Sequence, residues 1–169
     1  MDRAAAIEEM EQARNSFRQL LNDASSASLR RRSNGTRWTN RQLLFHMLFG
    51  YLIVRTLLPL LRAFGRRPDS WSRRFAATLN AGRRPFHMIN YVGSVGGGQL
   101  LPKRAMIALM DRTICGLERT LAGETEETLG LNMHFPPAWD PYFRDVMNVF
   151  DVYHYGTQHF EHHRRQLTL

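Results

Sequence analysis

Four of the seven histidines of this 169-residue chain lie near its C-terminus, in the stretch DVYHYGTQHFEHHRRQL at residues 151–167. If this stretch is a helix turning about 100° per residue, His159 and His163 lie one turn apart on the edge of its apolar face. Two imidazoles at that spacing can reach one metal ion. His154 and His162 fall on the far side of the same helix, so they are not expected to join the pair.

A metal ion also needs a ligand from another element, and His46 is the best candidate. It lies in the most hydrophobic segment of the chain, LLFHMLFGYLIVRTLLPLL at residues 43–61. Burying an imidazole there costs free energy unless its nitrogens find partners, which a position opposite the pair would supply. Three histidines also leave a coordination position open, as catalytic sites do.

The alternative to a metal site is that the histidines make core hydrogen bonds or respond to pH. His87 and His134, in irregular segments, are spare ligands.

The segments that carry His46, His159 and His163 have helical patterns, and no part of the chain shows strand-like alternation of any length. Apolar residues recur every three or four positions over residues 3–24. Thr39, with Gln42 three positions later, predicts a capping box at the start of a second helix, which runs to about Leu58, where Pro59 kinks or ends it.

Two further long helices follow in the second half of the chain. Pro102 is a favourable first-turn residue for the third helix, whose apolar stripe is Met106, Met110, Ile114, Leu117 and Leu121. Asp140 followed by Pro141 predicts the N-terminus of the last helix, which runs to about Leu167.

A long connection separates the second helix from the third. DSWSRRFAATLNA at residues 69–81 predicts a short helix in it, whereas Gly93–Gly98 has neither the dinucleotide-binding nor the P-loop spacing. We expect the glycine run to be a flexible crossover or lid. The predicted fold is all-α, a single-domain four-helix bundle over residues 1–169 with this crossover between helices two and three.

The charge and the cysteine content bear on whether the protein binds nucleic acid and on where in the cell it is expected. The net charge is +8, almost wholly from scattered arginines, because Lys103 is the only lysine. Nucleic-acid readers concentrate such charge on one element, so we expect only weak, salt-sensitive, sequence-independent DNA binding. Arg55 and Pro59 within the apolar segment indicate a core helix rather than a membrane span. The one cysteine, Cys115, excludes an intramolecular disulfide and favours a cytoplasmic protein.

Two motifs resemble a known family. WTNRQLLFHM at residues 38–47 resembles the second-helix signature of the DinB/YfiT-like metalloprotein superfamily, and HFEHHRRQL at residues 159–167 resembles its last-helix signature. The resemblance spans nearly the whole chain. It implies a DinB-like bundle that holds a divalent metal, commonly zinc or nickel, through His46, His159 and His163. Characterised relatives include S-transferases and isomerases that use mycothiol, bacillithiol or glutathione.

The function expected from the resemblance is a metal-dependent reaction between a low-molecular-weight thiol and a small electrophile, either S-transfer or isomerisation. A bound divalent ion would lower the pKa of the thiol. Mycothiol is the thiol that the arginine-rich composition favours. Tyr153 and Tyr155 are the acid–base candidates, and Arg55 and Arg164 are candidates to hold an anionic thiol.

Other functions remain open on the sequence. Some relatives carry glutamate where this chain has His159, which argues against maleylpyruvate isomerase chemistry here. No glutamate directly follows His159, so the zinc-protease motif is absent from the sequence. The alternatives are a metal-binding helical protein without catalysis and a metal-assisted hydrolase. The chain is also a candidate homodimer.

Overall fold

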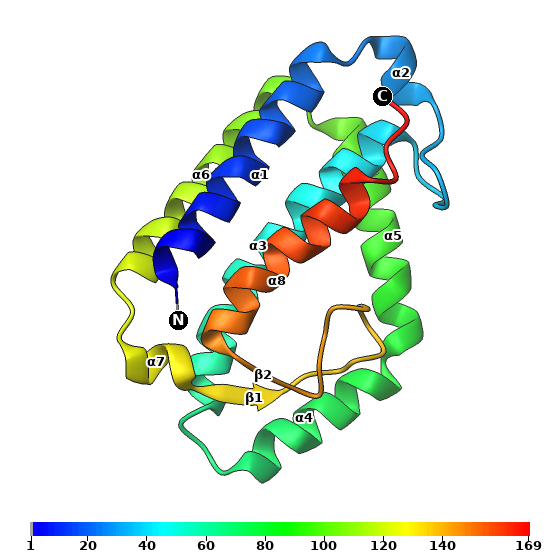
Figure 1. Ribbon diagram of the computed structural model, residues 1–169. Helices are drawn as coiled ribbons and strands as arrows, with labels where there is room; N and C mark the ends of the chain where they lie inside the picture. The colour runs from blue at the N-terminus through cyan, green and yellow to red at the C-terminus, as the bar shows by residue number, and fades with distance from the viewer. Residues whose placement is uncertain (1) are drawn as a thin grey trace.

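The computed structural model describes residues 2–169, and its main feature is an elongated bundle of long helices (Figure 1). The helix α1 (Arg3–Asp23) lies beside α6 (Lys103–Ala122), and α8 (Val149–Arg164) lies beside the central helix α3 (Asn40–Phe64). The crossover helix α5 (Arg83–Leu100) packs along another side of α3. The predicted all-α bundle is therefore confirmed. The four bundle helices are α1, α3, α6 and α8.

The core of the bundle consists of the apolar faces that the sequence pattern predicted. The whole α6 stripe, Met106 to Leu121, is at most 2% exposed. Among the described residues, α3 is the one helix long and apolar enough to cross a membrane by length and composition, and 56% of its most apolar window is buried inside the bundle. That burial agrees with the interpretation of α3 as a core helix.

The start of α3 is as predicted, but its end is not. The Thr39 side chain accepts a hydrogen bond from the backbone N–H of Gln42, and the Gln42 side chain accepts one from Thr39, which completes the capping box. The helix then continues through Pro59 to Phe64. Proline removes one backbone hydrogen bond. Burial of Leu58 and Leu61 on either side keeps the helix packed in the core and outweighs that loss.

The crossover contains α4 (Asp69–Ala81), as predicted, and a second helix, α5 (Arg83–Leu100). The prediction that Gly93–Gly98 is a flexible crossover or lid was wrong, because these residues lie inside α5. A Cβ on Gly97 would lie 2.2 Å from the Phe45 ring, and one on Gly98 would lie 2.8 Å from the Cα of Gln42. The glycines therefore allow α5 to pack closely against α3, and this packing overrides their poor helix propensity.

The segment before the last helix also differs from the prediction. Two short strands, β1 (Asn132–His134) and β2 (Val146–Asn148), pair antiparallel, although no strand was expected. The helix α8 begins directly after β2, with Asn148 and Asp151 forming its capping box, and ends at Arg164. Asp140 and Pro141 lie in the loop before β2. This cap, adjacent to the paired strand, replaces the start predicted at Asp140. Two short helices were also unpredicted: α2 (Ser26–Arg30) and α7 (Glu126–Gly130).

Candidate metal centre

Two glycines allow α3 and α8 to approach closely where the histidines lie. A Cβ on Gly50 would lie 2.5 Å from Cδ2 of His159, and a Cβ on Gly156 would lie 2.7 Å from the Tyr51 ring. Real Cβ atoms do not come so near. The His159 imidazole therefore fills the space that a side chain at position 50 would occupy, and this places it against α3.

The three predicted histidines come together at this helix contact. Each offers one ring nitrogen, and the three nitrogens all lie within 4.8 Å of one another. The Nε2 atoms of His46 and His163 are 3.1 Å apart. His46 is 3% exposed and His159 is 5% exposed, whereas His163 is half-buried. The cluster could hold a metal ion.

The tautomer of His46 follows from its neighbours on α5. The hydroxyl of Ser94 donates to the backbone carbonyl of Asn90, 2.8 Å away. The Ser94 oxygen must therefore accept the hydrogen bond from Nδ1 of His46, at 3.1 Å. A neutral imidazole carries one proton, so Nε2 of His46 presents a lone pair.

The other two histidines are oriented in the same way. Nδ1 of His159 donates to a carboxylate oxygen of Asp140 at 3.0 Å, and Tyr155 donates its hydroxyl to the same oxygen at 3.1 Å. Nδ1 of His163 donates to the side-chain oxygen of Gln166 at 2.7 Å. Metal-binding histidines usually have such acceptors behind them, because the acceptor fixes the ring and leaves Nε2 free.

Three Nε2 lone pairs therefore converge without a proton between them. Nε2 of His159 is buried and has no hydrogen-bond partner. A buried polar atom left unsatisfied costs about 1–3 kcal/mol. A divalent cation at the convergence point would accept all three lone pairs, and nitrogen donors of this kind suit zinc or nickel. The residues present therefore fit a metal ion.

The pKa values of His46 and His163 are those of neutral imidazoles, the form in which histidine binds a metal. Burial, followed by the nearby charges of the other two histidines, lowers the pKa of His46 well below its usual value. Burial lowers the pKa of His163 to about 3. Burial would raise the pKa of Asp140, but its hydrogen bonds and the charge of His159 bring it below the usual value. His46 and His163 are thus neutral at pH 7, as ligands must be, and Asp140 is ionised.

An apolar cavity of about 370 Å³ opens beside the histidines. Its walls come from α3, α5, α8 and the loop before β2, and two of its aromatic rings, those of Phe86 and Trp139, stack 3.7 Å apart. Its polar lining includes two of the three histidines and Asp140. The apolar lining residues are Phe49, Leu52, Ile53, Leu57, Phe86, Trp139 and Phe143.

The structure brings only one of the four other predicted site residues to this cavity. Tyr155 lines it, and burial raises the pKa of Tyr155 well above its usual value, with Asp140 as the second cause. Tyr153, near the N-terminal end of α8, instead donates to Glu124 in the turn after α6. Arg55 lies beside α6. Arg164 pairs with the neighbouring Glu161 at 2.8 Å.

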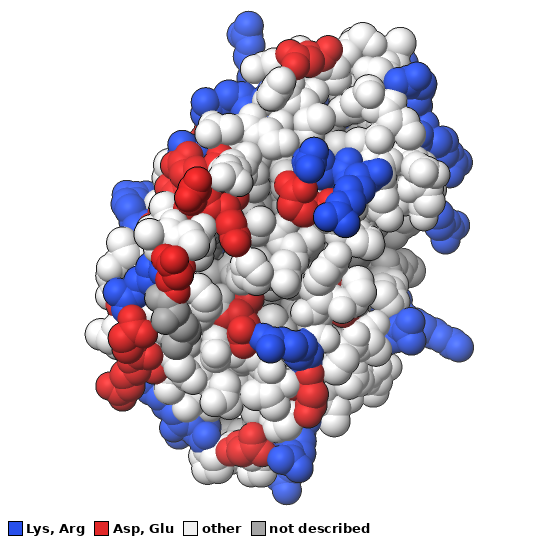
Figure 2. Space-filling view, in the orientation of Figure 1, with Lys and Arg blue, Asp and Glu red and all other residues white. Residues whose placement is uncertain are grey.

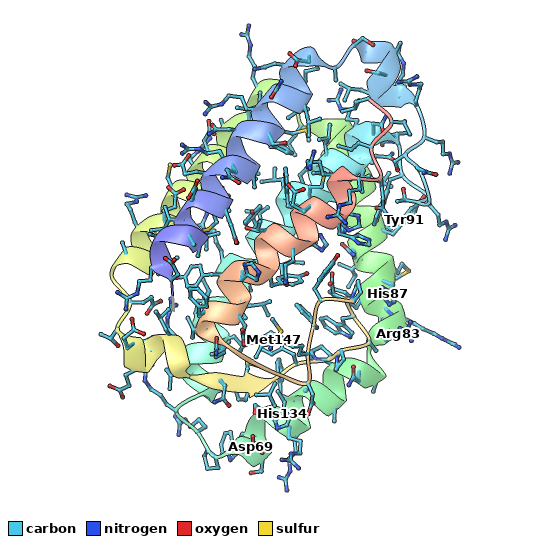
Figure 3. All side chains as sticks on the ribbon, viewed as in Figure 1. Asp69, Arg83, His87, Tyr91, His134 and Met147 are labelled. Carbon is cyan, nitrogen blue, oxygen red and sulfur yellow. The ribbon has the colours of Figure 1, made fainter. Side chains whose placement is uncertain are left out.

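The remaining histidines have partners of their own. His134 is held between two carboxylates, 3.0 Å from Asp69 and 3.2 Å from Asp145, in the lower part of Figure 3. His87 lies on α5 and accepts a hydrogen bond from Arg83. His154 pairs with Glu9, and His162 pairs with Tyr142. None of these four rings belongs to the described metal-ligand cluster, although the His162 ring packs edge-on against His163 with 4.9 Å between the ring centres.

Three residues that orient the cluster were missed from the sequence. Asp140 was interpreted as a helix cap, and Ser94 lies in the glycine run that was interpreted as a loop. Gln166 lies three residues after His163, and this spacing in the last turn is the one signal that could have revealed it. The sequence contains no such signal for the other two, because their positions depend on how the crossover and the loop fold back onto α3 and α8.

The charged side chains are spread over the surface rather than gathered around the site. Figure 2 shows basic side chains both around the outline of this face and within it, and acidic ones mainly on the α1 side. The arginines seen from this side therefore form no single recognition surface.

A helical bundle with three convergent histidines beside an apolar cavity defines a class of candidate metal-dependent proteins. The family model of the DinB superfamily matches residues 9–167, nearly the whole chain. The chain therefore belongs to the DinB superfamily, as its two motifs indicated. Searches of curated proteins and of solved structures gave no match.

Proposed function

We propose that this protein is a metal-dependent enzyme that joins a low-molecular-weight thiol to a small apolar electrophile. His46, His159 and His163 would hold a divalent metal, with zinc or nickel as the preferred ions. The convergence of three unprotonated Nε2 atoms beside an apolar cavity carries this proposal. Thiols of the mycothiol, bacillithiol and glutathione type are the proposed co-substrates, and a cytoplasmic location would supply them.

A bound divalent ion would lower the pKa of the thiol and so provide a thiolate at neutral pH. In the transfer, the thiol sulfur forms a bond to the electrophilic carbon, and the leaving group departs with its electron pair. The thiol proton passes to solvent. The chain provides the surroundings: apolar residues bind the electrophile and exclude water, and Asp140 holds the His159 ring in place.

Tyr155 has a positioning role in this scheme. Its raised pKa keeps the phenol protonated at neutral pH, so it acts as a donor rather than as a base. Its hydroxyl donates to Asp140 and fixes the carboxylate that in turn orients His159. Tyr153 bonds to Glu124 and does not line the cavity, so it has no part in this scheme.

The test has two stages. Elemental analysis after purification without chelators should find about one divalent metal per chain, and His46→Ala should lose it. His154→Ala is the matched control, because His154 lies outside the cluster and should keep the metal. Thiol loss with a panel of electrophiles is then followed for the metal-loaded protein. If the metal-loaded wild type and the His46→Ala protein consume every thiol at the same rate, thiol transfer is rejected.

A further inference from the structure

A second pocket, of about 390 Å³, adjoins the histidine centre beside His163. It lies where the turn before α3, the helix α5 and the end of the chain meet. It shares Asn90 with the apolar cavity, and each pocket is lined by part of the cluster: His46 and His159 line the cavity, and His163 lines the second pocket. Its lining residues are Gly35, Thr36, Arg37, Trp38, His87, Asn90, Tyr91, His163 and Gln166.

The second pocket is more polar than the first, and its lining includes a cation. The guanidinium of Arg37 lies over the Tyr91 ring, 5.2 Å from its centre. Within residues 2–169, Arg37 makes no ion pair, and none of the lining residues is acidic. Stacking on an aromatic face holds a guanidinium in place and leaves its N–H groups available to an anion.

Other donors in this pocket also lack acceptors. Arg83, His87 and Tyr91 follow one another along α5 (Figure 3). Arg83 donates to Nε2 of His87 at 3.2 Å, so in the neutral ring Nδ1 carries the proton. The indole N–H of Trp38 is buried and has no partner.

Half of the unsatisfied buried polar atoms of the described residues line the two pockets. Six buried side-chain nitrogen or oxygen atoms lack a hydrogen-bond partner in the part of the chain that the structure describes. Three of them belong to His159, Trp38 and Asn90, which line one pocket or both. Native proteins leave few such atoms unpaired. The metal would account for Nε2 of His159, and an acceptor group of a ligand in the second pocket would account for the indole N–H of Trp38.

We propose that the second pocket binds the carboxylate-bearing end of the thiol co-substrate, with Arg37 as its counter-charge, while the electrophile occupies the apolar cavity. This assignment rests on the proposed function. A carboxylate in the apolar cavity would lose its hydration, and the lining of that cavity contains the acidic Asp140 but no arginine or lysine. Beside Arg37 it gains charge-assisted hydrogen bonds instead. The pocket therefore favours thiols of the glutathione or bacillithiol kind over mycothiol, which carries no carboxylate.

The test measures binding by calorimetry with S-methylglutathione, which has both carboxylates but no free thiol. Arg37→Gln should weaken binding at least about tenfold, or about 1.4 kcal/mol, and Arg37→Lys should retain part of the affinity. Arg55→Gln, a change at another exposed arginine, should bind like the wild type. The diethyl ester of the same compound should bind more weakly than the acid. The proposal is overturned if the acid does not bind at millimolar concentration, if Arg37→Gln has no effect, or if the ester binds as tightly.

The same probe separates this inference from the proposed function, because its binding requires no chemistry. Binding that depends on Arg37, in a protein that transfers no thiol, would support the pocket and reject the enzyme. Thiol transfer that proceeds as fast with mycothiol as with glutathione, and is unchanged by Arg37→Gln, would support the enzyme and reject the pocket.

Discussion

At the scale of single residues, the orientation of His159 depends on Asp140. The carboxylate accepts from Nδ1 of His159 and from the Tyr155 hydroxyl, and Asp140 is itself largely buried. An acceptor behind a metal-binding histidine fixes its tautomer and raises its basicity, and its loss typically lowers metal affinity 10–100-fold.

Asp140→Asn tests this role without changing the size of the side chain. We expect zinc affinity, measured by competition with a chromophoric chelator, to fall about 10–100-fold while the helical content stays the same. Asp145→Asn is the control. Asp145 lies in the same loop as Asp140, but its carboxylate bonds to His134 and not to the cluster. Equal affinities of the two variants would show that the Asp140 carboxylate has no part in metal binding.

Residue types and spacings predicted the cluster better than they predicted its surroundings. His159 and His163 are one helical turn apart, so their shared direction follows from the sequence once the segment is helical. His46 could be paired with them because an unpartnered imidazole in an apolar segment is costly. Asp140, Ser94 and Arg37 reach the site from a loop, a crossover helix and a turn, and no local pattern fixes where those segments lie.

At the scale of elements, the separation of α3 and α8 determines whether the histidines can meet. Gly50 is the critical position, since its Cβ would lie 2.5 Å from one atom of the His159 ring and 3.0 Å from Nε2. Gly50→Ala should therefore displace the ring, reduce zinc affinity and lower the melting temperature. The control is Gly116→Ala in α6, where a Cβ would meet nothing within 4 Å.

The control substitution should change stability in the opposite direction. Alanine is favoured over glycine within a helix by about 1 kcal/mol, so Gly116→Ala should stabilise the protein by up to that amount and leave the metal bound. Calorimetric melting and metal titration measure both effects. A Gly50→Ala protein that binds zinc like the wild type would show that the close approach at position 50 is not needed.

The same tight packing explains why the elements were only partly predictable. Capping and apolar stripes gave α1, α4, α6 and the start of α3, since those signals are local. Gly93–Gly98 has poor intrinsic helix propensity, and its helical state depends on close contact with Phe45 and Gln42 of another helix. The start of α8 depends in turn on the pairing of β2 with β1, which is equally non-local.

At the scale of the whole molecule, a metal held between α3 and α8 would link two halves of the bundle. A ligand that binds only the folded state stabilises it by about 2.7 kcal/mol at 100 times its dissociation constant. For a chain of this size, that should raise the melting temperature by roughly 5–10 °C. A chelator should reverse the shift in the wild type and do nothing in His46→Ala. An unchanged melting temperature in the wild type would indicate that the histidines serve only the core.

The last prediction concerns acid stability of the metal-free protein. His46 and His163 have lowered pKa values in the folded state, about 3 for His163, whereas the unfolded value is about 6.5. Between these values the unfolded chain binds more protons than the folded one, so stability is full above about pH 6.5 and falls on acidification toward pH 3. One such histidine contributes at most about 1.4 kcal/mol per pH unit to this slope.

His163→Gln removes one of these titrating groups and isolates its effect. With chelator present throughout, urea unfolding from pH 7.5 to 4.5 should give a shallower fall in the free energy of unfolding for His163→Gln than for the wild type. Carboxylates outside the cluster contribute equally to both proteins. Loss of the His163 charge also relieves part of the lowering of the His46 pKa, so the difference between the two curves reports position 163 together with its coupling to His46. Parallel curves for the wild type and His163→Gln would mean that the folded protein accepts a proton at His163 as readily as the unfolded chain does.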